Sequence, residues 1–388
     1  MQDYFVDLHI HLGRTASGKP VKITASNKLT LEAVLEEAQI RKGLDMVGVI
    51  DCQVPEVLIG LRNGLASGEL TELTGGGVRF GDITLILGAE IEIHDENCQG
   101  LIHALCYMKT VEKMVEFSNW LSKRMKNVTL STQRVYENAV EIQHMVDSLG
   151  GLFIPAHIFT PFKSLYGKGV RRSLTEVFEP ELIDAVELGL SADTSMASGL
   201  SELDRYVFLS NSDAHSVGKI AREYQKVRMK EPNFEELRLA LRELDGRRVI
   251  ANYGLSPKLG KYYTTVCEKC FSQRMGLADA CTGCEHSKFV KGVSDRIAEL
   301  ADGSESGRSR PPYIHQVPLD FIPGLGPKTL EKLRGDFGTE MGILHEANYE
   351  ELVEVVGEKV ASLIVAARSG KLVFKAGGGG RFGRISDE

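Results

Sequence analysis

The apolar run YFVDLHIH, Tyr4–His11, decides the fold, because it is predicted as a strand that ends on two histidines. Similar short runs follow along the first 250 residues, separated by stretches with helical periodicity. The predicted strands are Tyr4–Leu8, Met46–Ile50, Leu85–Ile91, Leu101–Tyr107, Leu152–Ile154, Ala185–Leu188 and Tyr206–Leu209. Strands that alternate with helices indicate a parallel α/β fold, and at this length they favour a barrel over an open sheet.

Ionisable side chains lie in or at the ends of these strands: His9, His11, Asp51, Glu90, His103, His157, Asp213 and His215. The C-terminal strand ends of a parallel barrel converge on one face, where active sites are built. Nitrogen and oxygen donors suit Zn²⁺, Mn²⁺ or Fe²⁺, whereas Mg²⁺ prefers oxygen. We therefore predict a centre of two or three divalent metals (Zn²⁺, Mg²⁺ or Mn²⁺) with Glu90 bridging, as in phosphoryl displacement.

Four motifs resemble those of the PHP (polymerase and histidinol phosphatase) family: Asp7-Leu8-His9-Ile10-His11, the strand of Glu90, Pro155-Ala156-His157 and Ser212-Asp213-Ala214-His215. The resemblance implies a distorted (βα)7 barrel that holds two or three metals for phosphoester hydrolysis. It departs at Asp51-Cys52, where that family usually has an Asp-His pair. The third metal position is therefore either weak or supported by Asp51 alone. Cys52 is either a ligand or a small apolar residue.

We name three acids, Glu90, Asp193 and Asp213, as candidate catalytic residues. Asp193 follows the Ala185–Leu190 run, and two readings of it stay open. It is either a further acid that holds a metal or orients water, or the cap of a helix.

The second signal is a pair of CxxC units, Cys267-x2-Cys270 and Cys281-x2-Cys284. Four thiolates at this spacing predict one tetrahedral Zn²⁺ with no open position, hence a structural site. The segment from Gly246 to Gly292 holds eight Lys or Arg against three acids, inside a chain of net charge −7. These basic flanks indicate either a nucleic-acid contact or an ordinary solvated surface.

The third signal is IPGLGPKT, Ile322–Thr329, which resembles the hairpin of a helix-hairpin-helix motif. Such hairpins present backbone N–H groups at a helix N-terminus to a DNA phosphate. Val356-Gly357-Glu358-Lys359 resembles a degenerate second hairpin. The candidate DNA-binding residues here are Gly324, Gly326, Lys328 and Thr329. A plain helical protein-interaction module is the alternative.

A loop after the strand of His157 mixes aromatic and basic residues: Phe162, Lys163, Tyr166, Lys168, Arg171 and Arg172. Such a loop could stack a base and hold its phosphates, or it could be an ordinary surface loop. We carry Lys163, Tyr166, Lys168, Arg171 and Arg172 forward as candidate DNA-binding residues.

Composition excludes several classes of protein. The chain is 43% hydrophobic and 26% charged, which is ordinary for a globular protein and unlike a disordered or coiled-coil chain. No stretch approaches the roughly 18 apolar residues of a membrane span, and the N-terminus lacks signal-peptide features. We expect a cytoplasmic, nucleoid-associated protein that does not contact a membrane.

The sequence predicts this organisation: a PHP phosphoesterase barrel over residues 1–250, a four-cysteine zinc module over 251–300, a linker over 301–318, a helix-hairpin-helix domain over 319–370 and a flexible tail over 371–388. This order of modules resembles the endonuclease Q family along nearly the whole chain. The resemblance implies a DNA repair endonuclease that incises 5′ to deaminated bases (uracil, hypoxanthine, xanthine) and abasic sites. A basic tail with Arg381, Phe382 and Arg384 makes a replication sliding clamp a further candidate partner.

Two alternatives stay open. One is a PHP-type phosphatase acting on a small phosphomonoester, which predicts indifference to deletion from Cys267 onward. The other is a DNA-binding adaptor with a vestigial barrel, which predicts that the zinc of the four cysteines is the sole bound metal.

Overall fold

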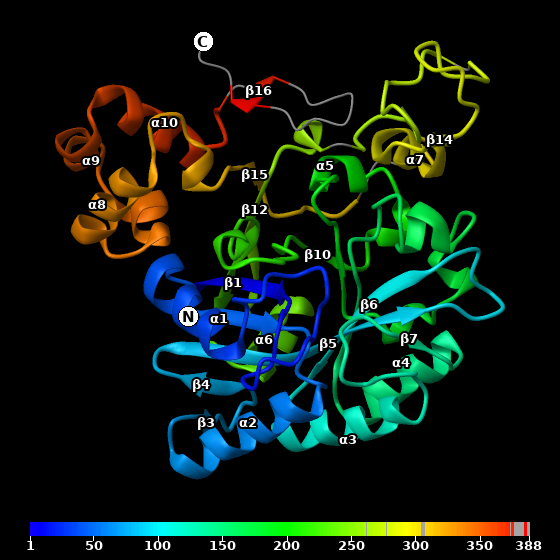
Figure 1. The fold of residues 1–388 in the computed structure, drawn as a ribbon, viewed down its shortest axis with the longest axis horizontal. Helices are drawn as coiled ribbons and strands as arrows, with labels where there is room; N and C mark the ends of the chain where they lie inside the picture. The colour runs from blue at the N-terminus through cyan, green and yellow to red at the C-terminus, as the bar shows by residue number, and fades with distance from the viewer. Residues whose placement is uncertain (261, 277, 304–306, 373, 376–383, 386–388) are drawn as a thin grey trace.

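The computed structural model describes residues 1–388 except 261, 277, 304–306, 373, 376–383 and 386–388. Within these residues, the N-terminal part is a distorted barrel (Figure 1). Its seven strands are β1 (Gln2–Ile10), β2 (Met46–Val49), β5 (Ile83–Ile93), β6 (Ile102–Met108), β8 (Leu152–Pro155), β9 (Ala185–Glu187) and β10 (Val207–Leu209). The ring closes where Ile158 N donates to Glu187 O and where Ile10 bridges Ala214. The predicted α/β barrel is thereby confirmed.

One barrel strand runs against the expected direction. β1, β2 and β5 pair in parallel, as do β9 and β10, but β6 is antiparallel to both of its neighbours, β5 and β8. The start of β6 therefore lies at the same end of the barrel as the C-terminal ends of the other strands. His103 is the second residue of β6, so it reaches the common face from the N-terminal end of its strand.

Helices cover the outside of the barrel, and side-chain caps fix where most of them begin. Thr110, Asn138 and Asn233 each accept a hydrogen bond from a backbone N–H in the first turn of the helix that follows. The bounds are α1 (Leu31–Glu36), α2 (Pro55–Ser67), α3 (Val111–Ser122), α4 (Ala139–Ser148), α5 (Thr194–Ala197) and α6 (Phe234–Leu241).

The sheet extends beyond the barrel on both sides. β3 (Thr71–Glu72), β4 (Val78–Phe80) and β7 (Arg134–Val135) join it at β5, and β11 (Tyr224–Met229), β12 (Arg248–Gly254) and β15 (Tyr313–His315) join it at β1.

β15 lies inside the segment 301–318, which we expected to be a linker. The strand pairs in parallel with β12, and the neighbouring Arg308 and Arg310 donate to the barrel carbonyls of Asp204 and Leu203. The described part of this segment is therefore bound to the barrel, because two guanidinium groups satisfy carbonyls there.

Two smaller parts lie above the barrel on opposite sides, the cysteine-bearing segment at the upper right and a helical part at the upper left (Figure 1). The first contains β13 (Val266–Cys267), β14 (Phe289–Val290) and α7 (Val293–Leu300). The second contains α8 (Pro327–Phe337), a π-helical turn η9 (Gly342–Glu346), α9 (Tyr349–Val356) and α10 (Glu358–Arg368). In the expected tail, β16 (Phe374–Lys375) pairs with β17 (Arg384–Ile385), while Gly377–Gly380, Arg381 and Phe382 lie outside the described residues.

The helical part is docked on the barrel through η9. The ring of His345 lies 4.6 Å from Phe5 and 4.9 Å from Tyr253, and its Nε2 lies 2.7 Å from the Tyr224 hydroxyl. Lys42 and Glu340 form a buried ion pair at 2.9 Å beside it. These contacts fix the helical part relative to β1, β11 and β12.

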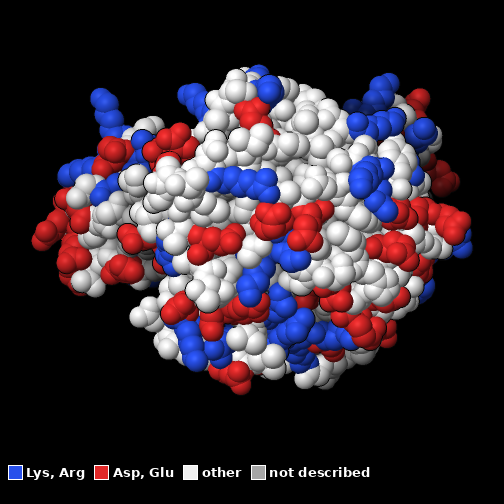
Figure 2. Space-filling view, turned by 90° about the horizontal axis from the view of Figure 1, so that it is seen from below, with Lys and Arg blue, Asp and Glu red and all other residues white. Residues whose placement is uncertain are grey.

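None of the described helices is long and apolar enough to cross a membrane. On the face made by α2 and α3, acidic and basic side chains are interspersed (Figure 2).

Candidate metal centre and nucleic-acid surface

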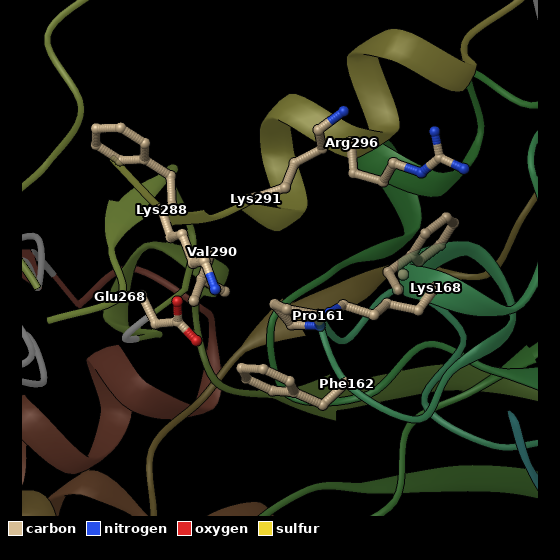
Figure 3. Close-up of a pocket in the computed structure, with 11 residues that line it drawn as sticks. Pro161, Phe162, Lys168, Glu268, Lys288, Val290, Lys291 and Arg296 are labelled. Atoms are coloured by element: carbon tan, nitrogen blue, oxygen red, sulfur yellow. The ribbon is translucent and has the colours of Figure 1, made fainter. Parts of the chain in front are cut away.

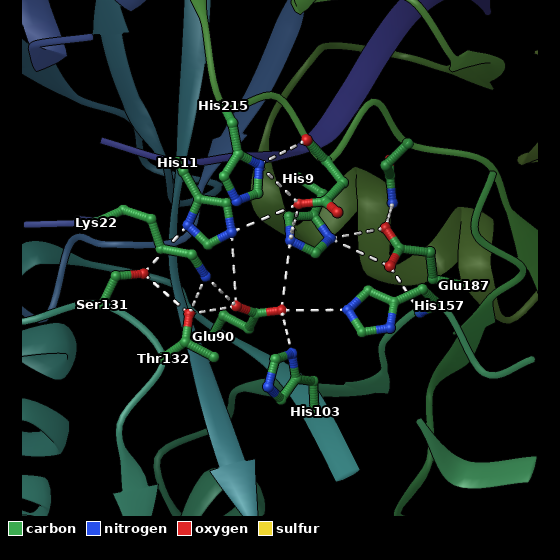
Figure 4. A network of polar contacts seen from close by, with 12 residues as sticks. His9, His11, Lys22, Glu90, His103, Ser131, Thr132, His157, Glu187 and His215 are labelled. Atoms are coloured by element: carbon green, nitrogen blue, oxygen red, sulfur yellow. Dashed lines mark hydrogen bonds and ion pairs between the residues drawn. The ribbon is translucent and has the colours of Figure 1, made fainter. Parts of the chain in front are cut away.

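Glu90, on β5, lies at the middle of the predicted ligands (Figure 4). Its Oε1 lies 3.0 Å from His103 Nδ1, 3.3 Å from His157 Nε2 and 3.7 Å from His9 Nε2. Its Oε2 lies 3.5 Å from His11 Nε2. The two oxygens therefore face different histidines, as the bridging role predicted for Glu90 requires.

Asp213 and His215 close the other side of the centre. Asp213 Oδ1 lies 3.4 Å from His9 Nε2 and 3.5 Å from His11 Nε2, and the ring of His215 lies 4.5 Å from the ring of His11. Three overlapping sets have their ligand atoms within 4.8 Å of one another: His9, His11 and Glu90; His11, Asp213 and His215; Glu90, His103 and His157. Seven of the eight predicted ligands are thus brought together.

The chemistry of the centre favours bound cations. His9 Nε2 and His11 Nε2 are buried without a hydrogen-bond partner among the described residues, and both are aimed at carboxylates. Burial by itself would lower the pKa of His9, but the carboxylates of Glu187 and Asp213 raise it to about 10. Burial would likewise raise the pKa of Glu90, yet His103 and the other nearby cations hold it well below the ordinary value. The residues fit divalent metals, which would take the place of those protons.

Two buried carboxylates orient candidate histidine ligands through the ring nitrogen that faces away from the centre, Nδ1. Glu187 Oε1 lies 2.9 Å from His9 Nδ1, and its Oε2 accepts from the backbone N–H of His157 at 2.8 Å. Asp51 Oδ2 lies 3.2 Å from His11 Nδ1 and accepts from Leu12 N at 2.7 Å. In both cases the Nε2 atom is left free to bind a metal, as in carboxylate–histidine–metal triads.

Two ligand positions lie on unusual backbone. His157 and Asp213 have positive φ angles of 32° and 45°. Such residues cost free energy and persist only where neighbours hold them. Glu187 anchors the amide of His157, and the Arg222 guanidinium donates to the carbonyls of Ser212 and Asp213. These hydrogen bonds therefore hold His157 and Asp213 in positions that their backbone conformations alone would disfavour.

Asp51 has other surroundings than expected, and the structure favours one of the two open readings for both Cys52 and Asp193. Asp51 lies behind His11 rather than in a ligand cluster. Cys52 is fully buried in the core, and burial raises its pKa to about 12, which supports the small apolar reading. Asp193 caps α5 through Met196 N and contacts His315 Nε2 at 3.0 Å, which supports the helix-cap reading.

Sequence reasoning missed Glu187 and Lys22. Glu187 gave a usable signal, a single carboxylate within an apolar strand. Lys22 gave none, because it lies in a loop between β1 and α1, yet its Nζ lies 3.2 Å from Glu90 Oε2. Both residues are drawn in Figure 4.

The four cysteines of the CxxC units come together between β13 and β14. Cys267 Sγ lies 3.6 Å from Cys284 Sγ, and Cys270 Sγ lies 3.4 Å from Cys281 Sγ. All four sulfur atoms lie within 4.8 Å of one another, and all seven cysteines of the chain are free. A tetrahedral thiolate site fits this arrangement.

Two cavities adjoin the loop that follows β8. One, of about 300 Å³, is lined by the metal-centre residues together with Lys22, Phe162, Lys163 and Tyr262. The other, of about 440 Å³, lies between this loop and the cysteine-bearing segment, with Lys168, Lys288, Lys291 and Arg296 on its walls (Figure 3). Pro161 and Phe162 border both cavities, so the two are neighbours.

The loop residues that we predicted to bind DNA differ in which of these two cavities they line. Lys163 lines the metal-centre cavity and Lys168 the second one, whereas Arg171 and Arg172 are exposed and line neither. Tyr166 is fully buried, with its hydroxyl bound to Glu202 at 2.9 Å, so its ring is unavailable to stack on a base.

The predicted hairpin lies where the chain enters α8. Gly324 has a φ of +91°, and a Cβ there would lie 2.9 Å from Val360 Cγ2, so a glycine is required. Gly326 is the N-cap residue and offers no side-chain cap, which leaves the backbone N–H groups of Lys328 and Thr329 open to an anion. Gly357, with a φ of +77°, joins α9 to α10 at the second predicted hairpin.

Comparison with known proteins places this geometry in a family. No family model matches the chain. The uncharacterized protein YqxK of Bacillus subtilis is 56% identical over 385 residues, which cover 99% of this chain and all of that protein. The uncharacterized protein MJ0043 of Methanocaldococcus jannaschii is 39% identical over 254 residues, 59% of this chain and 31% of that protein.

Two solved structures resemble the whole chain. The lesion-specific endonuclease PfuEndoQ of Pyrococcus furiosus has a TM-score of 0.85 and 32% identity, with 99% of this chain and 95% of that one covered. Endonuclease Q in complex with a 27-mer duplex that has an abasic lesion at the active site has a TM-score of 0.83 and 32% identity, covering 99% and 96%. The match extends over barrel, cysteine-bearing segment and helical part alike, and the chain therefore belongs to the endonuclease Q family.

Proposed function

We propose that the chain is a metal-dependent DNA repair endonuclease that hydrolyses the phosphodiester bond 5′ to an abasic site or a deaminated base (uracil, hypoxanthine or xanthine). The observation that carries the proposal is the full-length match to a lesion-specific endonuclease, together with intact histidine and carboxylate clusters in this chain. A barrel that had lost its activity would not be expected to retain seven potential metal ligands this close together.

The residues of the centre define the roles in hydrolysis. Divalent cations supply a nucleophile at neutral pH and neutralise charge on the attacking and leaving oxygens. Glu90 would bind cations with both of its oxygens, and His103 and His157 would bind on its Oε1 side. Asp213, whose side chain is 31% exposed, borders the cavity and is the carboxylate of the centre best placed to meet substrate and water.

The cavities suit an extruded nucleotide and its flanking strand. Extrusion costs a few kcal/mol and is cheapest for a damaged or poorly paired base, which contributes to selectivity. Phe162 is 46% exposed between the two cavities, where it could stack on a base, and Lys168 and Lys288 lie where backbone phosphates would pass. The lesion itself would be read in the cavity beside Glu90.

The two smaller parts would hold the duplex. The four-cysteine site would fold its segment around a structural Zn²⁺, and the hairpin at Gly324 and Gly326 would bind a phosphate without reading sequence. Both parts lie above the barrel in Figure 1, one toward each side, so one long duplex laid across the top of the barrel could contact both.

The test is an incision assay on labelled duplexes that are identical except for one nucleotide: a normal base, an abasic site, uracil, hypoxanthine or xanthine. We expect one cut 5′ to each lesion in the presence of Mg²⁺ or Mn²⁺, and an intact normal duplex. A truncated chain that ends before Cys267 should lose this activity, because it lacks both DNA-holding parts.

Other outcomes would contradict the proposal in distinguishable ways. Equal cutting of all duplexes would remove lesion recognition. No cutting of DNA, with hydrolysis of a small phosphomonoester that survives the truncation, would favour the phosphatase. A metal content of one zinc per chain and no hydrolysis of any substrate would favour the adaptor.

A further inference from the structure

The metal centre contains a cation of the chain's own, the ammonium group of Lys22. Its Nζ lies 3.2 Å from Glu90 Oε2 and donates to Thr132 Oγ1 (Figure 4). The side chain is 15% exposed, and it lines the 300 Å³ cavity beside His11 and His215. A lysine is seldom this buried unless it is paired, and here its partner is the central carboxylate.

Backbone hydrogen bonds hold the loop that bears Lys22 against the end of β1. Lys22 N donates to Leu12 O at 2.9 Å, and Val21 N donates to Gly13 O at 2.9 Å, so the loop folds back on the end of β1. A Cβ at Gly13 would lie 1.9 Å from Ser26 O, so only glycine permits this close approach. On the other side, Val21 O accepts from Ser131 N. The backbone that carries the Lys22 side chain is therefore held in a defined place beside the metal centre.

The ammonium is also the donor that a metal ion would displace most easily from Glu90. Oε2 has two lone pairs, and Thr132 and Lys22 already occupy them. Any cation that binds Oε2 must displace one of these donors. Thr132 is a short side chain with little freedom, whereas Nζ of Lys22 is at the end of a flexible stem and borders the cavity.

We propose that Lys22 is a catalytic residue whose ammonium contacts a non-bridging oxygen of the scissile phosphodiester. The inference rests on the proposed function and adds to it a group that no metal supplies. Negative charge grows on those oxygens as phosphorus is attacked, and a positive charge in the same cavity stabilises it. No bond to Lys22 forms or breaks, and it neither gives nor takes a proton. The other lysine in the cavity, Lys163, is 48% exposed and paired with Glu92, so it lies farther from the inner site.

The test compares Lys22→Met, Lys22→Arg and a matched control, Lys19→Met. Lys19 lies in the same loop, is 74% exposed and pairs with Glu56. Single-turnover incision of an abasic duplex at increasing enzyme concentration gives the maximal rate constant and the half-saturating concentration separately. Elemental analysis gives the metal content of each purified variant.

We expect Lys22→Met to lower the maximal rate constant about 100- to 1,000-fold, the usual effect of removing one transition-state donor. Its half-saturating concentration should stay within about threefold, and its metal content should equal that of the wild type. Lys22→Arg should recover most of the loss, because it keeps the charge, and Lys19→Met should behave as the wild type.

Three results would overturn the inference. A wild-type rate constant in Lys22→Met would show that the ammonium has no part in the step. Loss of bound metal would show that Lys22 only holds Glu90. A loss confined to the half-saturating concentration would make it a ground-state DNA contact. If the wild type itself cuts no lesion duplex, the proposed function fails, and this inference fails with it.

Discussion

Nδ1 of His9 lies 2.9 Å from Oε1 of Glu187, and this contact turns Nε2 of His9 toward Glu90 and Asp213. We predict that Glu187→Gln weakens Mn²⁺ binding about 10- to 100-fold, because an amide can no longer hold the imidazole in its metal-binding tautomer as a carboxylate does. Titration calorimetry on metal-depleted protein measures the affinity. The control is Glu181→Gln, an exposed residue paired with Arg205. Equal affinity in both variants would contradict the positioning role of Glu187.

His345 should make the stability of the chain pH-dependent. Burial, together with the nearby positive charges of Lys226 and Arg368, lowers the pKa of His345 to about 3. The unfolded chain binds a proton below pH 6.5 and the folded chain does not until about pH 3, so stability falls as pH falls through that window. The slope contributed by one such group is at most about 1.4 kcal/mol per pH unit.

Replacing that histidine should remove its share of the slope. We predict that the urea midpoint of His345→Phe changes less between pH 6.5 and pH 4.5 than that of the wild type, even if the variant is less stable at pH 7. His144→Asn, at an exposed position, is the control and should keep the wild-type slope. An unchanged slope in His345→Phe would mean that the histidine is protonated in the folded protein.

The four-cysteine site should bind one structural metal. We predict that Cys281→Ser loses one zinc equivalent per chain and becomes sensitive to proteolysis between residues 260 and 300, because the segment is too small to fold without the metal. Cys98→Ala, at a buried cysteine outside the cluster, should keep its zinc. Elemental analysis after gel filtration checks both. Full zinc content in Cys281→Ser would exclude the tetrahedral site.

Two glycines of the helical part should respond to alanine with opposite signs. Gly324→Ala should destabilise the protein by roughly 1–2 kcal/mol, because of its φ of +91° and the nearby Val360 side chain. Gly335→Ala, at an exposed and open position inside α8, should stabilise by about 0.5–1 kcal/mol. Urea unfolding at pH 7 measures both. If the hairpin binds DNA, Gly324→Ala should also weaken DNA binding, and Gly335→Ala should not.

Much of the barrel could be predicted from the sequence, because its strands are short apolar runs with ionisable residues at their ends. All seven expected strands are present, and α1, α3, α4, α5 and α6 begin at side-chain caps. The candidate ligands His9, His11, Glu90, His157 and Asp213 could be predicted because strand ends of a barrel converge.

The other features could not be predicted, because they depend on strand pairings and hydrogen bonds between segments that are distant in the sequence. His103 reaches the centre because β6 is antiparallel to its neighbours, whereas the prediction assumed that all barrel strands are parallel. Lys22 lies in a loop and Tyr166 in a single helical turn (η2, Leu165–Gly169), where backbone hydrogen bonds decide which side chain is buried. β15 has only three residues in a Gly- and Ser-rich stretch, and it forms because β12 leaves an edge for it to pair with.

The central claim is that this centre incises DNA at a lesion, and the most direct measurement is single-turnover cleavage of one abasic duplex by the wild type and Asp213→Asn. Asp82→Asn, at an exposed position far from the ligands, is the control. We predict a single metal-dependent cut 5′ to the lesion by the wild type and the control, and a cut by Asp213→Asn that is at least about 100-fold slower. Cleavage by Asp213→Asn at the wild-type rate, or no cleavage by a metal-loaded wild type, would contradict it.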